Sequence, residues 1–169
     1  MNEVNIFKLK LKINELLLIW QDFCRAHSTL YDQTSEEYLH LLSSDIEKLE
    51  EIIADKNITI QLITKLDNQR KMIIEELNTE FHFENISKIS EVVELTKTYL
   101  NDSEGTRLEK LNLLLLDIVE KIQDQNKLNQ LFLNKAILSL QDLKNSFSGR
   151  KTFKTYGANG VTKTNHVST

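Results

Sequence analysis

Glu37 and His40 combine a carboxylate and an imidazole at a spacing found in metal sites. On a helix, a Glu-x-x-His motif places a carboxylate and an imidazole on one face, as in the di-iron sites of four-helix bundles. Such a site needs the motif twice and two further glutamates, and His27, His82 and His166 supply no second copy. We therefore interpret the pair as surface polar residues and predict no metal site.

Cys24 and His27 also share a helix face and could act as a nucleophile and a base. No orienting group or oxyanion donor is visible near them, so packing in the core or at the surface explains both residues better. The sequence has no glycine-rich phosphate loop, zinc-ligand spacing or nucleophile elbow. We therefore predict that the protein is not an enzyme and has no cofactor.

Cysteine usage and hydropathy predict a cytoplasmic protein. Cys24 is the single cysteine and lies among apolar residues, which indicates a buried thiol in a reducing compartment. The longest apolar runs are five residues, Leu16 to Trp20, and four residues, Leu113 to Leu116. Because a bilayer-spanning helix needs about 20 apolar residues, we expect no membrane insertion.

The charge is divided unevenly along the chain. The net charge is −4, but the segment from Gly149 onward holds four basic residues and no acidic one, so residues 1–148 carry −8. An acidic body argues against nucleic-acid binding, because phosphate contacts need a basic face. We divide the chain into a helical domain, residues 1–148, and a flexible basic tail, residues 149–169.

The helical domain is predicted to be an all-α antiparallel bundle of three long helices and one short helix. The chain has no proline, and three of its four glycines lie in the tail, so little interrupts the helices. The tail has too few apolar residues to offset about 1–2 kcal/mol of backbone entropy per ordered residue. We expect it to be disordered.

The first two helices follow from apolar spacing. Apolar residues three and four apart from Ile6 to Leu30 predict one helix that continues through Leu41. Residues 34–37 could instead cap a fresh helix. A capping box at Ser44 and Glu47 predicts the start of the second helix. Its expected stripe, which has heptad-like spacing, is Ile46, Leu49, Ile53, Ile60, Ile63, Ile74 and Leu77, with Lys56, Asp67 and Arg70 between them.

Residues 85–100 predict a short helix, and residues 101–105 predict a loop that contains the one glycine of the helical domain. A capping box at Thr106 and Glu109 predicts the start of the last helix, which continues to about Phe147. That helix has apolar residues on more than one side. Either it occupies the middle of the bundle, or one side is kept for a partner helix.

Asn126 and Asn129 interrupt this apolar run with two amides one turn apart. They could form a polar layer that fixes packing register, or they could contact a partner. The residues that we expect to bind the partner are Leu115, Ile118, Ile122, Asn126, Asn129, Phe132, Leu133, Ile137 and Leu140.

The C-terminal pattern resembles a known family. Asn126-x-x-Asn129-x-Leu-Phe-Leu133, followed after a helical remainder by Thr155-Tyr156-Gly157-x-x-Gly160, resembles the FlgN family of flagellar type III export chaperones. The stretch LLSSDIEKLEEIIADKNITIQLITKLDNQRKMI, residues 41–73, is similar to the first helical hairpin of that family. The resemblance covers most of residues 30–162.

The resemblance implies a function. Such chaperones bind the C-terminal helices of hook-filament junction proteins in the cytosol, prevent premature assembly, and deliver them to the export gate. By analogy, Tyr156, Gly157 and Gly160 are expected to dock at the export gate, although the tail could also be a solvated terminus without function. The alternative for the whole protein is a structural coiled-coil protein that self-associates through the last helix.

Overall fold

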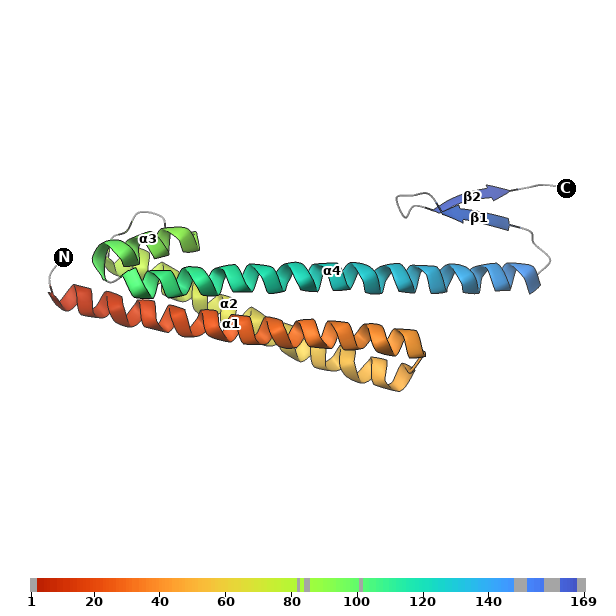
Figure 1. The fold of residues 1–169 in the computed structure, drawn as a ribbon, viewed down its shortest axis with the longest axis horizontal. Coiled ribbons are helices and arrows are strands. Elements are labelled where there is room, and N and C mark those ends of the chain that lie inside the picture. The colour runs from red at the N-terminus through yellow and green to blue at the C-terminus, as the bar shows by residue number, and fades with distance from the viewer. Residues whose placement is uncertain are drawn as a thin grey trace. The chain divides into compact units, whose positions relative to one another are not determined.

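The computed structural model describes residues 3–81, 83, 86–100, 102–147, 152–156 and 162–166. Its elements are α1 (Glu3–Ser43), α2 (Ile46–Phe81), α3 (Ile89–Tyr99), α4 (Asp102–Phe147), β1 (Thr152–Tyr156) and β2 (Thr162–His166) (Figure 1). The predicted three long helices and one short helix are confirmed. The chain forms two compact units, residues 1–126 and 127–169, and α4 contributes to both. The predicted domain boundary at residue 148 stays a prediction.

α1 and α2 form an antiparallel hairpin (Figure 1). α1 is continuous through Thr34, as the single-helix prediction expected. Its buried residues include Leu9, Ile13, Leu16, Trp20 and Phe23, which alternate spacings of three and four as a coiled-coil seam does.

The seam of α2 corrects the predicted stripe. Its buried residues are Ile52, Thr59, Leu66, Ile73 and Leu77, whereas Ile46, Ile53 and Ile60 are exposed. The heptad spacing is confirmed. Of the two heptad positions that form the seam, however, one lies one residue earlier along the chain than predicted. Sequence pattern misplaced it because Thr59 in the true seam is polar, whereas Ile60 beside it is apolar.

The turn between α1 and α2 also corrects a prediction. Ser44 has a left-handed φ of 55°. Its N–H donates to Leu41 O (3.4 Å), and the Asp45 N–H donates to His40 O (3.1 Å), which is the pattern of a Schellman motif. The Lys48 N–H then donates to Asp45 Oδ1 (3.2 Å). Asp45 therefore caps α2, and the predicted capping box at Ser44 is wrong because Ser44 terminates α1.

The core of the first unit lies where α2, α3 and the beginning of α4 pack against α1. Asn78 fixes the connection to α3, because its side chain both donates to Ile86 O (3.0 Å) and accepts from Ile86 N–H (2.9 Å). The Glu91 carboxylate accepts backbone hydrogen bonds from Lys88 and Ser87, which lower the pKa of Glu91 and hold the start of α3.

The start of α4 differs from the predicted loop at residues 101–105. α4 begins at Asp102, so the predicted start at Thr106 is wrong and Gly105 lies inside the helix. A Cβ on Gly105 would lie 3.2 Å from Val93 O and 3.0 Å from Lys97 Cγ of α3. Glycine therefore permits a close approach of two helices here, rather than a loop.

Two short strands lie in the tail. β1 and β2 pair antiparallel, with Thr152 opposite His166 and Tyr156 opposite Thr162. No regular structure is predicted for these two segments from the sequence. Four of the ten paired positions are threonine and two are aromatic, residue types that favour strands. Residues 148–151, 157–161 and 167–169 lie outside the described residues.

The turn between α1 and α2 should respond to substitution of Ser44 and Asp45. Replacing Ser44 by glycine should raise the free energy of unfolding by about 0.5 kcal/mol, because glycine adopts a positive φ without steric strain. Asp45→Ala should lower it by about 1 kcal/mol through loss of the cap. Urea unfolding followed by circular dichroism measures both changes. A destabilised Ser44→Gly variant would contradict the described turn.

A second prediction concerns an ion pair in the seam. Lys56 of α2 pairs with Glu37 of α1, and each side chain is 15% exposed. Glu37→Ala should lower the free energy of unfolding by about 1–3 kcal/mol, because Lys56 is then left partly buried without its partner.

Replacing both partners by leucine should restore most of that loss, since an apolar seam needs no ion pair. A double-mutant cycle built from Glu37→Leu, Lys56→Leu and the variant with both changes measures the coupling in unfolding free energy. If the two single changes are additive, the pair does not stabilise the hairpin as described.

Candidate functional site

The first half of α4 packs inside the first unit. Leu108 is fully buried in the main core, and Leu111 and Leu115 pack against it. Ile118 and Ile122 are also buried and form a second cluster with Cys24 of α1. The Trp20 indole N–H donates to Asn112 Oδ1 (3.4 Å) beside these contacts. Three of the predicted partner-binding residues, Leu115, Ile118 and Ile122, thus contribute to the core of this chain.

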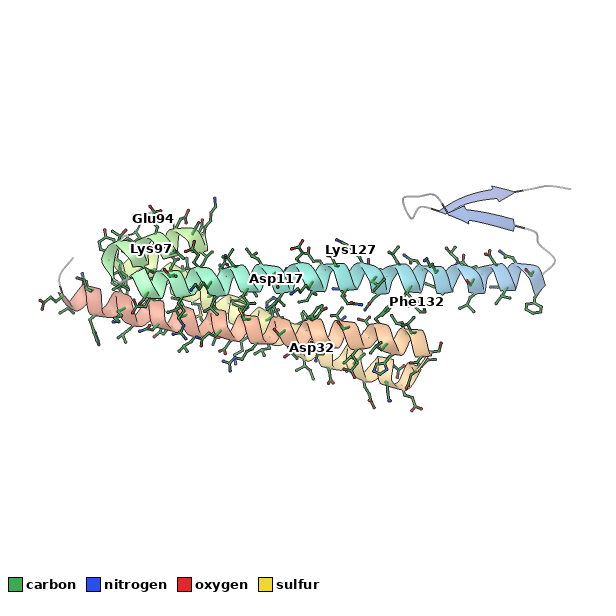
Figure 2. All side chains as sticks on the ribbon, in the orientation of Figure 1. Asp32, Glu94, Lys97, Asp117, Lys127 and Phe132 are labelled. Carbon is green, nitrogen blue, oxygen red and sulfur yellow. The ribbon has the colours of Figure 1, made fainter. Side chains whose placement is uncertain are left out.

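The second half of α4, residues 127–147, has a different surface. Leu133, Ile137 and Leu140 are 38%, 50% and 65% exposed, and Phe147 is exposed as well. Their spacings of four, three and seven residues place them on one side of the helix. We call these four residues the α4 stripe. Figure 2 shows side chains along this half of the helix, with Lys127 and Phe132 labelled.

Further large apolar residues of this half also face solvent. Leu128, Leu131 and Leu143 are each at least two-fifths exposed. Exposed single leucines are ordinary, but so many on one helical segment of 21 residues mark an interaction surface. Burial inside the bundle, one of the two interpretations of the sequence, therefore describes Leu108, Ile118 and Ile122 but not the α4 stripe.

The two asparagines also have different surroundings. Asn126 is half-buried, whereas Asn129 is 3% exposed and has a partner within the described residues. Phe132 is half-buried and partnered too. A polar layer that fixes packing register stays a prediction. Contact of either asparagine with another protein stays a prediction.

The predicted export-gate residues are placed only in part. Tyr156 is the last residue of β1, and its backbone pairs with that of Thr162. Gly157 and Gly160 lie outside the described residues. Docking of these three residues at an export gate stays a prediction.

The side chains that could act as nucleophile, base or metal ligand are instead engaged in contacts within the chain. The Cys24 thiol lies 3.4 Å from Leu111 O, and burial raises its pKa, so it stays protonated near neutral pH. His27 Nδ1 is 2.8 Å from Phe23 O, and His40 lies 3.6 Å from Glu36. Glu37 is not a free surface residue, in contrast to its interpretation from the sequence, because it pairs with Lys56. The pairing could have been suspected from the sequence, because Lys56 is a charged residue at a predicted seam position.

Metal ligands do not gather in the part of the chain that the structure describes. Those residues contain no group of three or more His, Cys, Asp or Glu side chains arranged to hold a metal ion. Within the same residues, no helix is both long enough and apolar enough to cross a membrane.

A helical bundle whose last helix carries a long exposed apolar surface has the features of a protein that binds other helices. Comparison with protein families gives a match to the FlgN protein family over residues 11–164. The chain therefore belongs to the FlgN family, whose members are flagellar export chaperones rather than enzymes. Comparisons with curated proteins and with solved structures give no match.

The two halves of α4 should respond differently to mutation. Ile118→Ala should lower the free energy of unfolding by about 2–4 kcal/mol, because it opens a cavity among buried side chains. Leu140→Ala should change it by no more than about 0.5 kcal/mol, because this side chain is exposed.

Urea unfolding of the full chain measures both free energies. Equal losses for the two variants would show that residues 133–147 are buried in the folded chain. That result would remove the basis for a free binding face.

Proposed function

We propose that this protein is a cytoplasmic export chaperone that binds the C-terminal helices of flagellar hook-filament junction proteins. Bound in this way, the junction proteins cannot assemble prematurely, and the chaperone delivers them to the type III export gate. Family membership supports the general role as a flagellar export chaperone. The observation that supports helix binding is the exposed α4 stripe.

The energetics favour such a complex. Fully burying a large apolar side chain is worth about 1.5–3 kcal/mol, so the four residues of the α4 stripe offer a substantial driving force. Ordering of side chains and loss of free rotation offset a large part of it. A cargo helix with apolar residues at spacings of three and four would cover the stripe by helix-in-groove packing.

The stripe divides the expected contacts into two groups. Leu133, Ile137 and Leu140 are available to cargo in the free chain, whereas Ile118 and Ile122 are already buried. The cargo site is therefore centred on the second half of α4. The tail, with its aromatic Tyr156 and its basic residues, serves delivery to the export gate rather than cargo binding.

Point variants test the cargo site. Leu133→Ser combined with Leu140→Ser should weaken binding of a junction protein about 100-fold, because two anchor side chains are lost. Leu62→Ser on α2 is the matched control, since Leu62 is also exposed. Isothermal titration calorimetry with purified junction protein measures the affinities. Unchanged binding by the double variant would refute the proposed site.

Two truncations separate binding from delivery. A chain ending at Leu140 should lose most cargo binding, because the α4 stripe then lacks Phe147 and its helix ends at an anchor residue, whereas a chain ending at Gly149 should bind cargo normally but support less export. Pull-down and a secretion assay in flagellated cells measure the two properties. Equal cargo binding by both truncations would show that the proposed division is wrong.

Self-association through the α4 stripe is the second candidate, because the same exposed residues would pair two copies. Light scattering distinguishes the two functions. A stable homodimer or filament that added junction protein does not dissociate would favour a structural coiled-coil protein.

A further inference from the structure

The tip of the α1–α2 hairpin concentrates negative charge. From Asp32 to Lys56 the chain holds eight acidic residues and two lysines. Both lysines are paired within the tip, Lys56 with Glu37 and Lys48 with Asp45 (3.8 Å). The exposed acidic residues that remain are Asp32, which Figure 2 labels on α1, and Glu36, Glu47, Glu50, Glu51 and Asp55. Most of the net charge of residues 1–148 therefore lies at this one end of the hairpin.

The same tip exposes a row of apolar side chains. Ile46, Ile53 and Ile60 of α2 are 68%, 43% and 45% exposed, and they recur every seven residues. On a helix with a heptad seam, residues seven apart keep the same flank. Leu42, in the last turn of α1 and four residues before Ile46, is exposed as well. We call Leu42, Ile46, Ile53 and Ile60 the tip row.

Contacts nearer the core show which side of the hairpin the tip row occupies. Asp67 lies seven residues after Ile60 and so shares its flank. Asp67 lines one groove of about 460 Å³ together with Trp20 and Phe23 of α1 and Leu115 of α4. The tip row thus extends the side of the hairpin on which the first half of α4 packs.

Acidic residues border the tip row closely. Glu50 follows Ile46 by four residues and precedes Ile53 by three, so it neighbours both on the helix surface. Glu47 and Glu51 lie four residues apart on the adjoining flank. Like charges at such spacings destabilise a helix, and no ion pair within the described residues relieves Glu47, Glu50 or Glu51.

We propose that the tip row and its acidic border form a docking surface for a basic amphipathic helix of a partner protein. The isoleucines at seven-residue spacing fit the apolar anchors of such a helix, and Glu47, Glu50 and Glu51 attract its lysines or arginines. A second copy of this chain would bring an equally acidic tip, and repulsion disfavours it. This surface consists of other residues than the α4 stripe and does not depend on the proposed cargo.

The test uses the full chain and two synthetic peptides about five helical turns long. One peptide has leucines at spacings of three and four with lysine elsewhere, and the other has glutamate in place of lysine. Isothermal titration calorimetry should show at least tenfold tighter binding of the lysine peptide, and that binding should weaken as salt is added. Equal affinity for the two peptides would overturn the proposal.

Variants locate the surface. Ile53→Ser with Ile60→Ser should lower the affinity for the lysine peptide about tenfold, and so should Glu47→Lys with Glu50→Lys. The controls are Leu62→Ser on the opposite flank and Glu75→Lys near the other end of α2, and both should bind normally. Thermal unfolding by circular dichroism confirms that each variant is folded.

Three outcomes would refute the proposal, because each shows either that the peptide binds another site or that the tip row has another occupant. Lysine-peptide binding lost in Leu133→Ser with Leu140→Ser, but not in the tip variants, places the peptide on the α4 stripe. Binding only after removal of residues 149–169 makes the basic tail of the chain the occupant. If the free chain is a homodimer that the tip variants dissociate, the occupant of the tip row is a second copy of the chain. Junction-protein affinity should be unchanged in the tip variants, so this test and that of the proposed function fail independently.

Discussion

The core of the first unit covers only part of α4, the longest helix of the chain. α4 has 46 residues, and the core formed with α1, α2 and α3 buries apolar side chains of α4 from Leu108 to Ile122. Beyond that point the helix carries seven more leucine and isoleucine residues, and six of them are exposed. Most of the stability of a helix in a protein comes from packing of its apolar face, so a partner that covers the exposed part of α4 also stabilises it.

Much of the fold could be predicted from the sequence because long helices leave a strong periodic signal. The spacing of apolar residues and the absence of proline were enough to predict four helices and the continuity of α1 through Thr34. Details that depend on tertiary packing were not predictable. The α2 seam uses Thr59 and a paired Lys56, which hydrophobicity alone does not favour, and Gly105 is typical of a loop until the closeness of α3 is known.

The candidate site shows the same division. Sequence periodicity identified α4 as too apolar, but it could not tell which residues the chain buries itself. Ile118 and Leu140 look alike in the sequence, because both are large apolar residues of the same helix; only contacts with Cys24 distinguish the buried Ile118 from the exposed Leu140. The acidic tip and its apolar row were missed because Ile46, Ile53 and Ile60 were assigned to the seam. In the corrected register these isoleucines are exposed. The chain therefore has two kinds of exposed apolar surface, the α4 stripe and the tip row with its acidic border.

Hydrogen–deuterium exchange distinguishes the part of α4 that this chain buries from the part that a partner would cover. In the free chain, amides between Leu108 and Ile122 should exchange slowly, whereas those between Leu131 and Phe147 should exchange rapidly, because most large apolar side chains there are exposed. Adding the C-terminal fragment of a junction protein should slow the second group and leave the first unchanged. Uniformly slow exchange along α4 in the free chain, unaffected by the fragment, would show that the second half of α4 is not a free binding surface.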